Sequence, residues 1–203
     1  MREENLNMFN SGYSTEMYRI IENDFIDFMS YVPLEENNLK VYSPKLADII
    51  MRCCSQIETF FKEWLMLPSL DHLKRIEIYR SKITIKKGPR LNIEDYGAFF
   101  EPRLRLSDHG LFVPTLNKSI YPFKEFSNNS KAPCWWTVNN NLKHHAYENR
   151  QEATLEIALY AIAALFFLNR SNSITTDKVE SILELRGILI WGSLPPNIES
   201  LER

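Results

Sequence analysis

The sequence predicts a mainly α-helical bundle of four or five helices with an irregular, partly β insertion at about residues 75–134. Apolar side chains recur every three or four residues in the N-terminal third, and an uninterrupted apolar run of 12 residues occupies positions 157–168. Both patterns are typical of helices that bury an apolar face. Pro and Gly, which interrupt regular structure, are concentrated in the middle of the chain and indicate the insertion. We expect a single domain over 1–203, with its helical core at about 14–72 and 135–186.

Composition is that of an ordinary globular domain. The chain has 203 residues, of which 44% are apolar and 25% are charged, so it can bury a core without a disulfide or a structural metal. Three cysteines form no C-x-x-C pair, and we expect free thiols in a reducing cytoplasm. The longest apolar run, 12 residues, is shorter than the roughly 20 needed to span a bilayer, so we expect no membrane partner.

Two amphipathic helices are predicted in the N-terminal third. Ser14 is a residue type that caps helices, and the apolar repeat that follows it continues to Pro33, which stops a helix. A second helix starts with Ser43 as N-cap and Pro44 in the first position, where the missing N–H has no cost. It ends at about residue 66. Its apolar face includes Cys53, so we expect a buried, unreactive thiol.

In the middle of the chain, apolar residues do not recur with one consistent spacing. A short helix is expected from Asp71, but isoleucines at positions 76, 78, 83 and 85 alternate with polar residues, which slightly favours a strand over residues 75–87. Residues 88–134 hold five of the ten prolines and three of the six glycines, together with many aromatic residues that argue against disorder. We expect an ordered insertion here, and long ordered insertions often carry function.

Helical character returns in the C-terminal third. It begins at Trp135, passes through three asparagines at 139–141, and leads to residues 153–168, which are apolar on nearly every side. A helix of that kind lies at the centre of a bundle. Thr175 or Thr176 is expected to cap a last amphipathic helix.

Charge is unevenly distributed along the chain. Residues 1–72 carry 6 basic and 12 acidic side chains, residues 73–150 carry 14 and 7, and residues 151–203 carry 4 and 7, which gives the net charge of −2. The basic middle segment can follow a phosphate backbone, although such charge blocks are more often a solvated face. The candidate nucleic-acid-binding residues are Arg75, Arg80, Lys82, Lys86, Lys87, Arg90, Arg103, Arg105 and His109.

The densest polar cluster, residues 135–150, immediately precedes the apolar run. Its last eight residues supply a lysine, two histidines, a tyrosine and an arginine. Imidazole titrates near neutrality and cations stabilise phosphate charge, which are the two requirements of metal-independent RNA cleavage. The competing interpretation is a polar helix end in which Trp135 and Trp136 pack and the histidines bind backbone groups.

The segment N-N-L-K-H-H-A-Y at residues 140–147 resembles a motif of HEPN domains. These are small all-α bundles of prokaryotic toxin, antiphage and nucleotidyltransferase-associated systems, and their active members are metal-independent ribonucleases. The motif is an Arg, often followed by Asn, then a His after four to six residues, and in one subgroup a Tyr two positions beyond the His. His145 and Tyr147 match that subgroup, whereas Asn140 occupies the place of the Arg. The resemblance covers about residues 135–168, and the N-terminal helices by pattern only.

The resemblance implies a HEPN-like bundle of an antiphage defence or toxin–antitoxin system. Because a neutral amide does not replace a guanidinium at a phosphate, we expect a non-catalytic scaffold that binds RNA or a cognate protein. Family members often dimerise through the motif face, so a homodimer is also expected. The alternative is a metal-independent endoribonuclease in which a histidine is the acid or base and cations stabilise the phosphate. Its candidate catalytic residues are His145, His144, Lys143, Arg150, Asn140 and Tyr147.

Two other alignments of an active site remain open. A shift by one residue makes Lys143 and His144 the functional pair. Arg150 would supply the missing charge only through a dimer or a break at Asn149, because on a continuous helix it points away from His145.

Other classes of site have weaker support. Arg103 and His109 have the motif spacing but lie in the insertion. His144, Glu148 and Glu152 share a helical face, yet the E-x-x-H pairs of two-metal bundles are missing. The sequence has no phosphate-binding glycine loop and no G-x-S-x-G elbow. We therefore expect neither a metal nor an organic cofactor.

Overall fold

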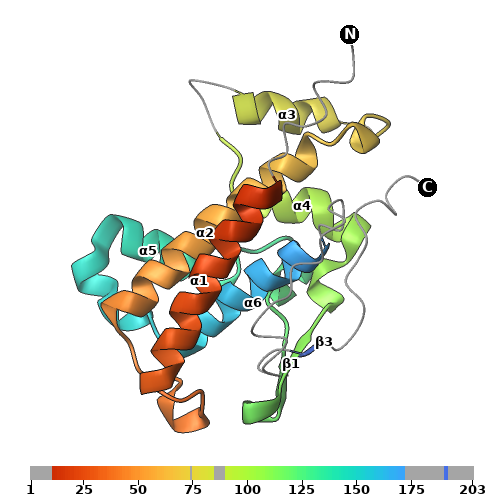
Figure 1. Ribbon diagram of the computed structural model, residues 1–203. Helices are drawn as coiled ribbons and strands as arrows, with labels where there is room; N and C mark the ends of the chain where they lie inside the picture. Colours follow the sequence, from red (N-terminus) through yellow and green to blue (C-terminus); the bar gives the residue numbers. More distant parts are fainter. Residues whose placement is uncertain (1–10, 74, 85–89, 172–189, 192–203) are drawn as a thin grey trace.

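A computed structural model describes residues 11–73, 75–84, 90–171 and 190–191. In these ranges the chain forms six α-helices and a small sheet, so the mainly α prediction is confirmed (Figure 1). None of the described helices has both the length and the apolar character needed to cross a bilayer. The helices are α1 (Ser11–Tyr31), α2 (Pro44–Leu65), α3 (Ile76–Thr84), α4 (Ile93–Leu104), α5 (Cys134–Asn149) and α6 (Leu155–Ser171).

Helix α2 is the central element of the bundle. The side-chain oxygen of Ser43 accepts a hydrogen bond from the Leu46 backbone N–H at 3.1 Å, and Pro44 occupies the first turn. This confirms the predicted start, and the helix ends at Leu65, one residue before the predicted end. Helix α2 packs most extensively on α6 and also contacts α1, α3 and α5 (Figure 1).

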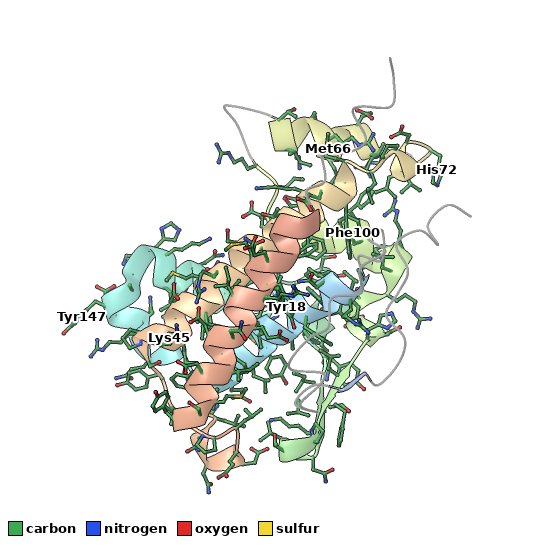
Figure 2. The ribbon with its side chains drawn as sticks, in the orientation of Figure 1. Tyr18, Lys45, Met66, His72, Phe100 and Tyr147 are labelled. Carbon is green, nitrogen blue, oxygen red and sulfur yellow. The ribbon has the colours of Figure 1, made fainter. Side chains whose placement is uncertain are left out.

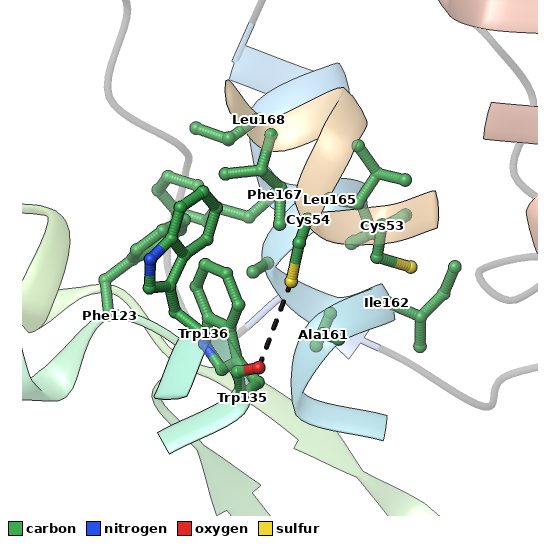
Figure 3. Packing of buried hydrophobic residues seen from close by; sticks show 14 of the residues in the cluster. Cys53, Cys54, Phe123, Trp135, Trp136, Ala161, Ile162, Leu165, Phe167 and Leu168 are labelled. Carbon is green, nitrogen blue, oxygen red and sulfur yellow. Dashed lines mark hydrogen bonds between the residues drawn. The ribbon is translucent and has the colours of Figure 1, made fainter. Parts of the chain in front are cut away.

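The cysteines of α2 lie inside the core, as predicted for Cys53. Cys53 and Cys54 are fully buried, and burial raises the pKa of both thiols well above the ordinary value. The Cys54 Sγ faces the backbone carbonyl of Trp135 at 3.9 Å, a weak hydrogen bond that joins α2 to the start of α5 (Figure 3). Both thiols therefore act as small apolar groups.

Helix α1 begins earlier than its predicted cap. It starts at Ser11, so Ser14 lies inside the helix and the prediction that it caps the helix was wrong. The cause is that residues ahead of Ser14 already continue the helical backbone. The helix ends at Tyr31, before Pro33, as predicted. Asp24 anchors α1 to α2: its carboxylate pairs with Lys45 and, at 2.6 Å, with Arg52.

The Asp24 pairs predict a pH-dependent stability. Burial alone would raise the pKa of Asp24, but the hydrogen bonds and charges of Lys45 and Arg52 outweigh it and lower that pKa. A lowered folded-state pKa stabilises the protein above the unfolded-state pKa, and the contribution disappears as pH falls through the folded-state pKa. Asp24→Asn is expected to lower the unfolding free energy by about 0.5–1 kcal/mol at pH 7 and by less below about pH 4.

Urea unfolding at several pH values measures this difference. Asp27→Asn is the matched control, because Asp27 is exposed on the same helix and forms no ion pair within the described residues. A deficit of Asp24→Asn that stays constant from pH 7 to pH 3 would contradict the expectation.

Helix α6 is the buried helix that the apolar run predicted. Every residue of the range 161–168 has no exposed surface. The connection that follows α1 covers its N-terminus: the backbone N–H groups of Leu155 and Glu156 donate to the carbonyls of Val41 at 2.8 Å and Leu39 at 3.0 Å. These bonds satisfy two donors that a helix start leaves without internal partners.

The strand expected over residues 75–87 was wrong, because residues 76–84 form α3. Ile76, Tyr79 and Ile83 follow the i, i+3, i+7 spacing of a helix and pack on the core, and Tyr79 contacts Phe99 with ring centroids 4.8 Å apart. Ile78, which completed the apparent alternation, is 49% exposed. An exposed isoleucine thus imitated the period of a strand.

The insertion is also more helical than predicted, because it contains α4. Asn92 and Asp95 form a capping box, in which each side chain accepts the other residue's backbone N–H at 2.9 and 3.0 Å. Helix α4 packs into the core: the ring of Phe61 in α2 stacks on Tyr96 at 5.2 Å and on Phe100 at 5.4 Å. The insertion therefore helps to build the core.

The partly β character of this region is confirmed by a three-stranded antiparallel sheet of order β2-β1-β3. Strand β1 (Leu111–Val113) lies between β2 (Lys118–Ile120) and β3 (Ile190–Trp191). No sequence pattern had predicted β3. The last helix expected after Thr175 or Thr176 lies outside the described residues.

Candidate functional site

The motif residues lie at the exposed end of α5. The first three turns of this helix bury one face, which includes Trp135, Trp136 and Leu142, against the core. At His145 the backbone leaves helical geometry (φ −144°, ψ 56°) and the helix kinks. The side chains of residues 145–148 and of Arg150 are exposed, whereas Asn149 donates from Nδ2 back to the Asn141 carbonyl at 3.3 Å. Tyr147 points away from the protein (Figure 2).

The three asparagines of α5 have three different environments. Asn139 is fully buried, and its two side-chain polar atoms have no hydrogen-bond partner in the described structure. Asn140, at the place of the motif arginine, is exposed. Asn141 donates from Nδ2 to the Glu152 carboxylate at 2.9 Å and so holds α5 against the turn that precedes α6. The roughly 100° step between successive helix residues separates the three amides.

Both histidines are exposed to water. His145 Nδ1 lies 3.1 Å from the Glu148 carboxylate, and these side chains are 67% and 71% exposed, so the contact contributes little energy. Lys143 extends its Nζ to 5.8 Å from the centre of the Trp136 ring. The imidazoles, the ammonium and Glu148 thus form an open polar surface rather than a closed site.

Arg150 is directed to Tyr147 and not to the histidines. Its Nη1 donates to the Tyr147 carbonyl at 2.5 Å, and its guanidinium carbon lies 4.5 Å from the centre of the Tyr147 ring. Helix α5 ends at Asn149, and a 3-10 turn follows at Arg150–Glu152. The helix therefore does break at Asn149, which was the condition under which Arg150 could approach the histidines. Within the described residues, however, no hydrogen bond or ion pair joins Arg150 to either histidine.

The region 140–150 forms what we call the α5 corner: Asn140, Lys143, His144, His145, Tyr147 and Arg150. All six side chains are exposed, and they do not line either of the two pockets described below. Strong stabilisation of a developing charge requires preorganised donors in a site that excludes water. The α5 corner is instead open to water and combines cations with an exposed aromatic ring.

Arg80 holds the fold together. Its Nε and Nη2 donate to the carbonyls of Leu65 at 2.7 Å and Leu67 at 2.8 Å, and its Nη1 pairs with Asp71 at 2.7 Å. The side chain is only 15% exposed. Arg80 therefore attaches α3 to the end of α2, and we leave it out of any proposed nucleic-acid surface.

Most of the other basic candidates are engaged in separate local contacts. The Arg103 guanidinium lies 4.2 Å over the Phe99 ring, and Arg105 pairs with Asp108 at 2.5 Å. The ring of His109 lies 5.5 Å from that of Phe167. Arg75 is exposed, Lys82 and Arg90 meet at one pocket, and Lys86 and Lys87 lie outside the described residues.

The larger of the two pockets lies between the sheet and the start of α5 and α6. Its volume is about 460 Å³, and its lining includes Cys134, Glu156 and Tyr160. Burial raises the pKa of the Cys134 thiol to about 11, and burial likewise raises the pKa of Tyr160. Glu156 is paired with Lys40 at 2.8 Å. Sequence reasoning missed this pocket because its walls come from separate segments without a common motif.

The described part of the chain offers no group of three His, Cys, Asp or Glu side chains that could hold a metal. His144, Glu148 and Glu152, which one helical face would have joined, are divided by the kink: Glu148 contacts His145, and Glu152 contacts Asn141.

Comparisons with models of known protein families, with curated proteins and with solved structures find no match. The functional argument therefore depends on the motif and on the geometry of the α5 corner.

Proposed function

We propose that this protein is a HEPN-like, non-catalytic scaffold of a prokaryotic defence or toxin–antitoxin system, and that the α5 corner binds single-stranded RNA. The observation that carries the proposal is the pair formed by Tyr147 and Arg150. Tyr147 is 80% exposed, and the Arg150 guanidinium lies against its ring. An exposed aromatic ring of this kind is suited to stacking on an unpaired base.

The charges around this ring suit a phosphate backbone. Lys143 and Arg150 are cations, and His144 and His145 add positive charge when protonated. Glu148 is the acidic residue among them and is paired with His145. Stacking on Tyr147 with nearby cations is the combination by which proteins bind single strands with little sequence preference.

Three features favour binding over cleavage. Asn140 replaces the motif arginine, the histidines are exposed, and the contacts of Arg150 are with Tyr147. Cleavage without a metal needs an acid or base and a cation positioned together at one phosphate. The contacts of the α5 corner instead place the guanidinium beside an aromatic ring.

Tyr147→Ala is expected to weaken RNA binding about 5–150-fold, because stacking on an aromatic side chain contributes about 1–3 kcal/mol per base. The measurement is fluorescence anisotropy with a labelled single-stranded RNA in the presence of EDTA. Tyr31→Ala is the matched control, since Tyr31 is also 80% exposed but lies at the end of α1, and it should bind RNA as the wild type does. Equal affinities of the wild type and Tyr147→Ala would contradict the proposal.

The same samples test for cleavage. RNA recovered intact after incubation in EDTA is the expected result. RNA cleavage by the wild type that disappears in a His144→Ala/His145→Ala double variant would contradict the scaffold function. It would show instead that the protein is a metal-independent endoribonuclease. A folded wild-type protein that binds no RNA at all would exclude an RNA-binding α5 corner and favour a cognate protein as the partner.

A further inference from the structure

A second pocket is lined by residues of α2, α3, the start of α4 and the segment just before α4, and none of its lining residues belongs to the α5 corner. Its volume is about 250 Å³, and Ile83 and Leu91 form its apolar wall. Pockets that hold drug-sized ligands measure roughly 300–1,000 Å³. This pocket therefore has room for one functional group and the first atoms attached to it.

Three cations from separate elements line this pocket: Lys62 in α2, Lys82 in α3 and Arg90 before α4. Lys62 is neutralised by Glu58, which also lines the pocket, at 2.7 Å. Lys82 and Arg90 are less completely neutralised than Lys62. Their positive charge is therefore available to a ligand in the pocket.

The contacts of Lys82 and Arg90 leave both side chains available. Lys82 Nζ lies 3.5 Å from one oxygen of Asp95, a long contact, and the other oxygen of Asp95 accepts the Asn92 N–H of the capping box. Arg90 is exposed and forms no ion pair with any described residue. Counted with Glu58 and Asp95, the three cations leave one net positive charge.

Tyr96 adds a buried donor. Its side chain is fully buried and lines the pocket, and its hydroxyl has no hydrogen-bond partner in the described structure. Burial raises the pKa of Tyr96, and the charges of Glu58 and Asp95 raise it further, so the hydroxyl keeps its proton. A buried hydroxyl without a partner is unfavourable, and an acceptor placed in the pocket would satisfy it.

We propose that this pocket binds the phosphate group of a small organic phosphate monoester. A monoester carries about −1.5 to −2 charges near neutrality, so the net positive charge of the pocket attracts it, and Lys82 and Arg90 are the cations that bind it. A guanidinium binds two phosphate oxygens at once, and the Tyr96 hydroxyl donates to a further oxygen. Ile83 and Leu91 contact the organic part. This proposal does not depend on RNA binding at the α5 corner.

Isothermal titration of the full chain with ribose 5-phosphate tests the pocket, and ribose is the probe without phosphate. We expect the phosphate ester to bind and ribose not to bind. Arg90→Gln and Lys82→Gln should each weaken binding by about tenfold or more, in the range of a lost charged hydrogen bond. Lys131→Gln is the control, because Lys131 is exposed and does not line the pocket.

Tyr96→Phe separates a binding role from a structural one. It removes only the unpartnered hydroxyl, so the melting temperature of the free protein should stay the same or rise while the affinity for ribose 5-phosphate falls. A fall of both quantities would show that Tyr96 is structural. Equal binding of ribose and its phosphate, or unchanged binding by Arg90→Gln and Lys82→Gln, would overturn the proposal.

Two sources can supply such a phosphate, a free sugar phosphate or the 5′ end of an RNA. RNA with a 5′-phosphate is compared with the same RNA carrying a 5′-hydroxyl, in the wild type, in Arg90→Gln and in Tyr147→Ala. A preference for the 5′-phosphate that requires Arg90 identifies the RNA end, and equal binding of both RNAs identifies the free ester. Tyr147→Ala keeps its affinity for ribose 5-phosphate, so the failure of one proposal is distinguishable from the failure of the other.

Discussion

Phe61→Ala is expected to lower the free energy of unfolding by about 3–5 kcal/mol. Phe61 is fully buried in α2, and its ring contacts four other aromatic rings. It stacks on Tyr96 at 5.2 Å and Phe100 at 5.4 Å in α4, and meets Phe123 edge-on at 6.1 Å. Truncation opens a cavity in a close-packed core. The neighbouring rings belong to α4 and to the segment around Phe123, and they cannot all shift to fill it.

Urea unfolding followed by far-UV circular dichroism measures this loss. Phe28→Ala is the matched control, because Phe28 is only partly buried on α1 and should lose less stability. Equal losses for the two variants would mean that Phe61 has no special position between α2 and the insertion.

Trp135→Ala is expected to cost about 3–5 kcal/mol as well, with an additional polar contribution. The indole is fully buried at the start of α5, and its Nε1 donates to the Pro122 carbonyl at 2.7 Å. Its ring meets those of Phe123 and Trp136 edge-on at 5.9 and 6.1 Å (Figure 3). Truncation removes apolar contact and leaves a buried carbonyl without its donor.

Trp135→Phe isolates the polar contribution. Phenylalanine keeps much of the apolar area but cannot donate, so a loss of about 1–3 kcal/mol is expected from the unpaired carbonyl. Trp136→Phe is the comparison, since Trp136 is almost as buried and makes no hydrogen bond through its indole to a described residue. If Trp135→Phe unfolds at the same urea concentration as the wild type, the bond to Pro122 has no net effect.

Sequence patterns predicted the helices whose signals are local and redundant. Ser43 and Pro44 mark the start of α2, and the apolar run marks α6, because capping and burial each follow from the nearest residues. Helix α3 was missed because exposed Ile78 gave an alternating pattern. Helix α4 was missed although Asn92 and Asp95 carried its capping signal, because the Pro and Gly content of the segment concealed it.

The candidate site was predictable in composition but not in geometry. The motif identified the residues of the α5 corner, yet nothing local indicated the kink at His145 or the turn of Arg150 toward Tyr147. Charge counts likewise grouped Arg80 with Lys82, although tertiary contacts give the first a structural role and place the second in a pocket. Tertiary contacts between distant segments determine these differences.

The segment that follows α1 caps the N-terminus of α6, and this contact has a consequence for synthesis on the ribosome. Lys40 and its partner Glu156 are 116 positions apart, and the backbone bonds at the start of α6 span a similar separation. A nascent chain that has completed α2 therefore exposes its apolar face until residues 155–171 have left the exit tunnel. Such intermediates are prone to aggregation, so productive folding of this chain depends on the late arrival of its most apolar helix.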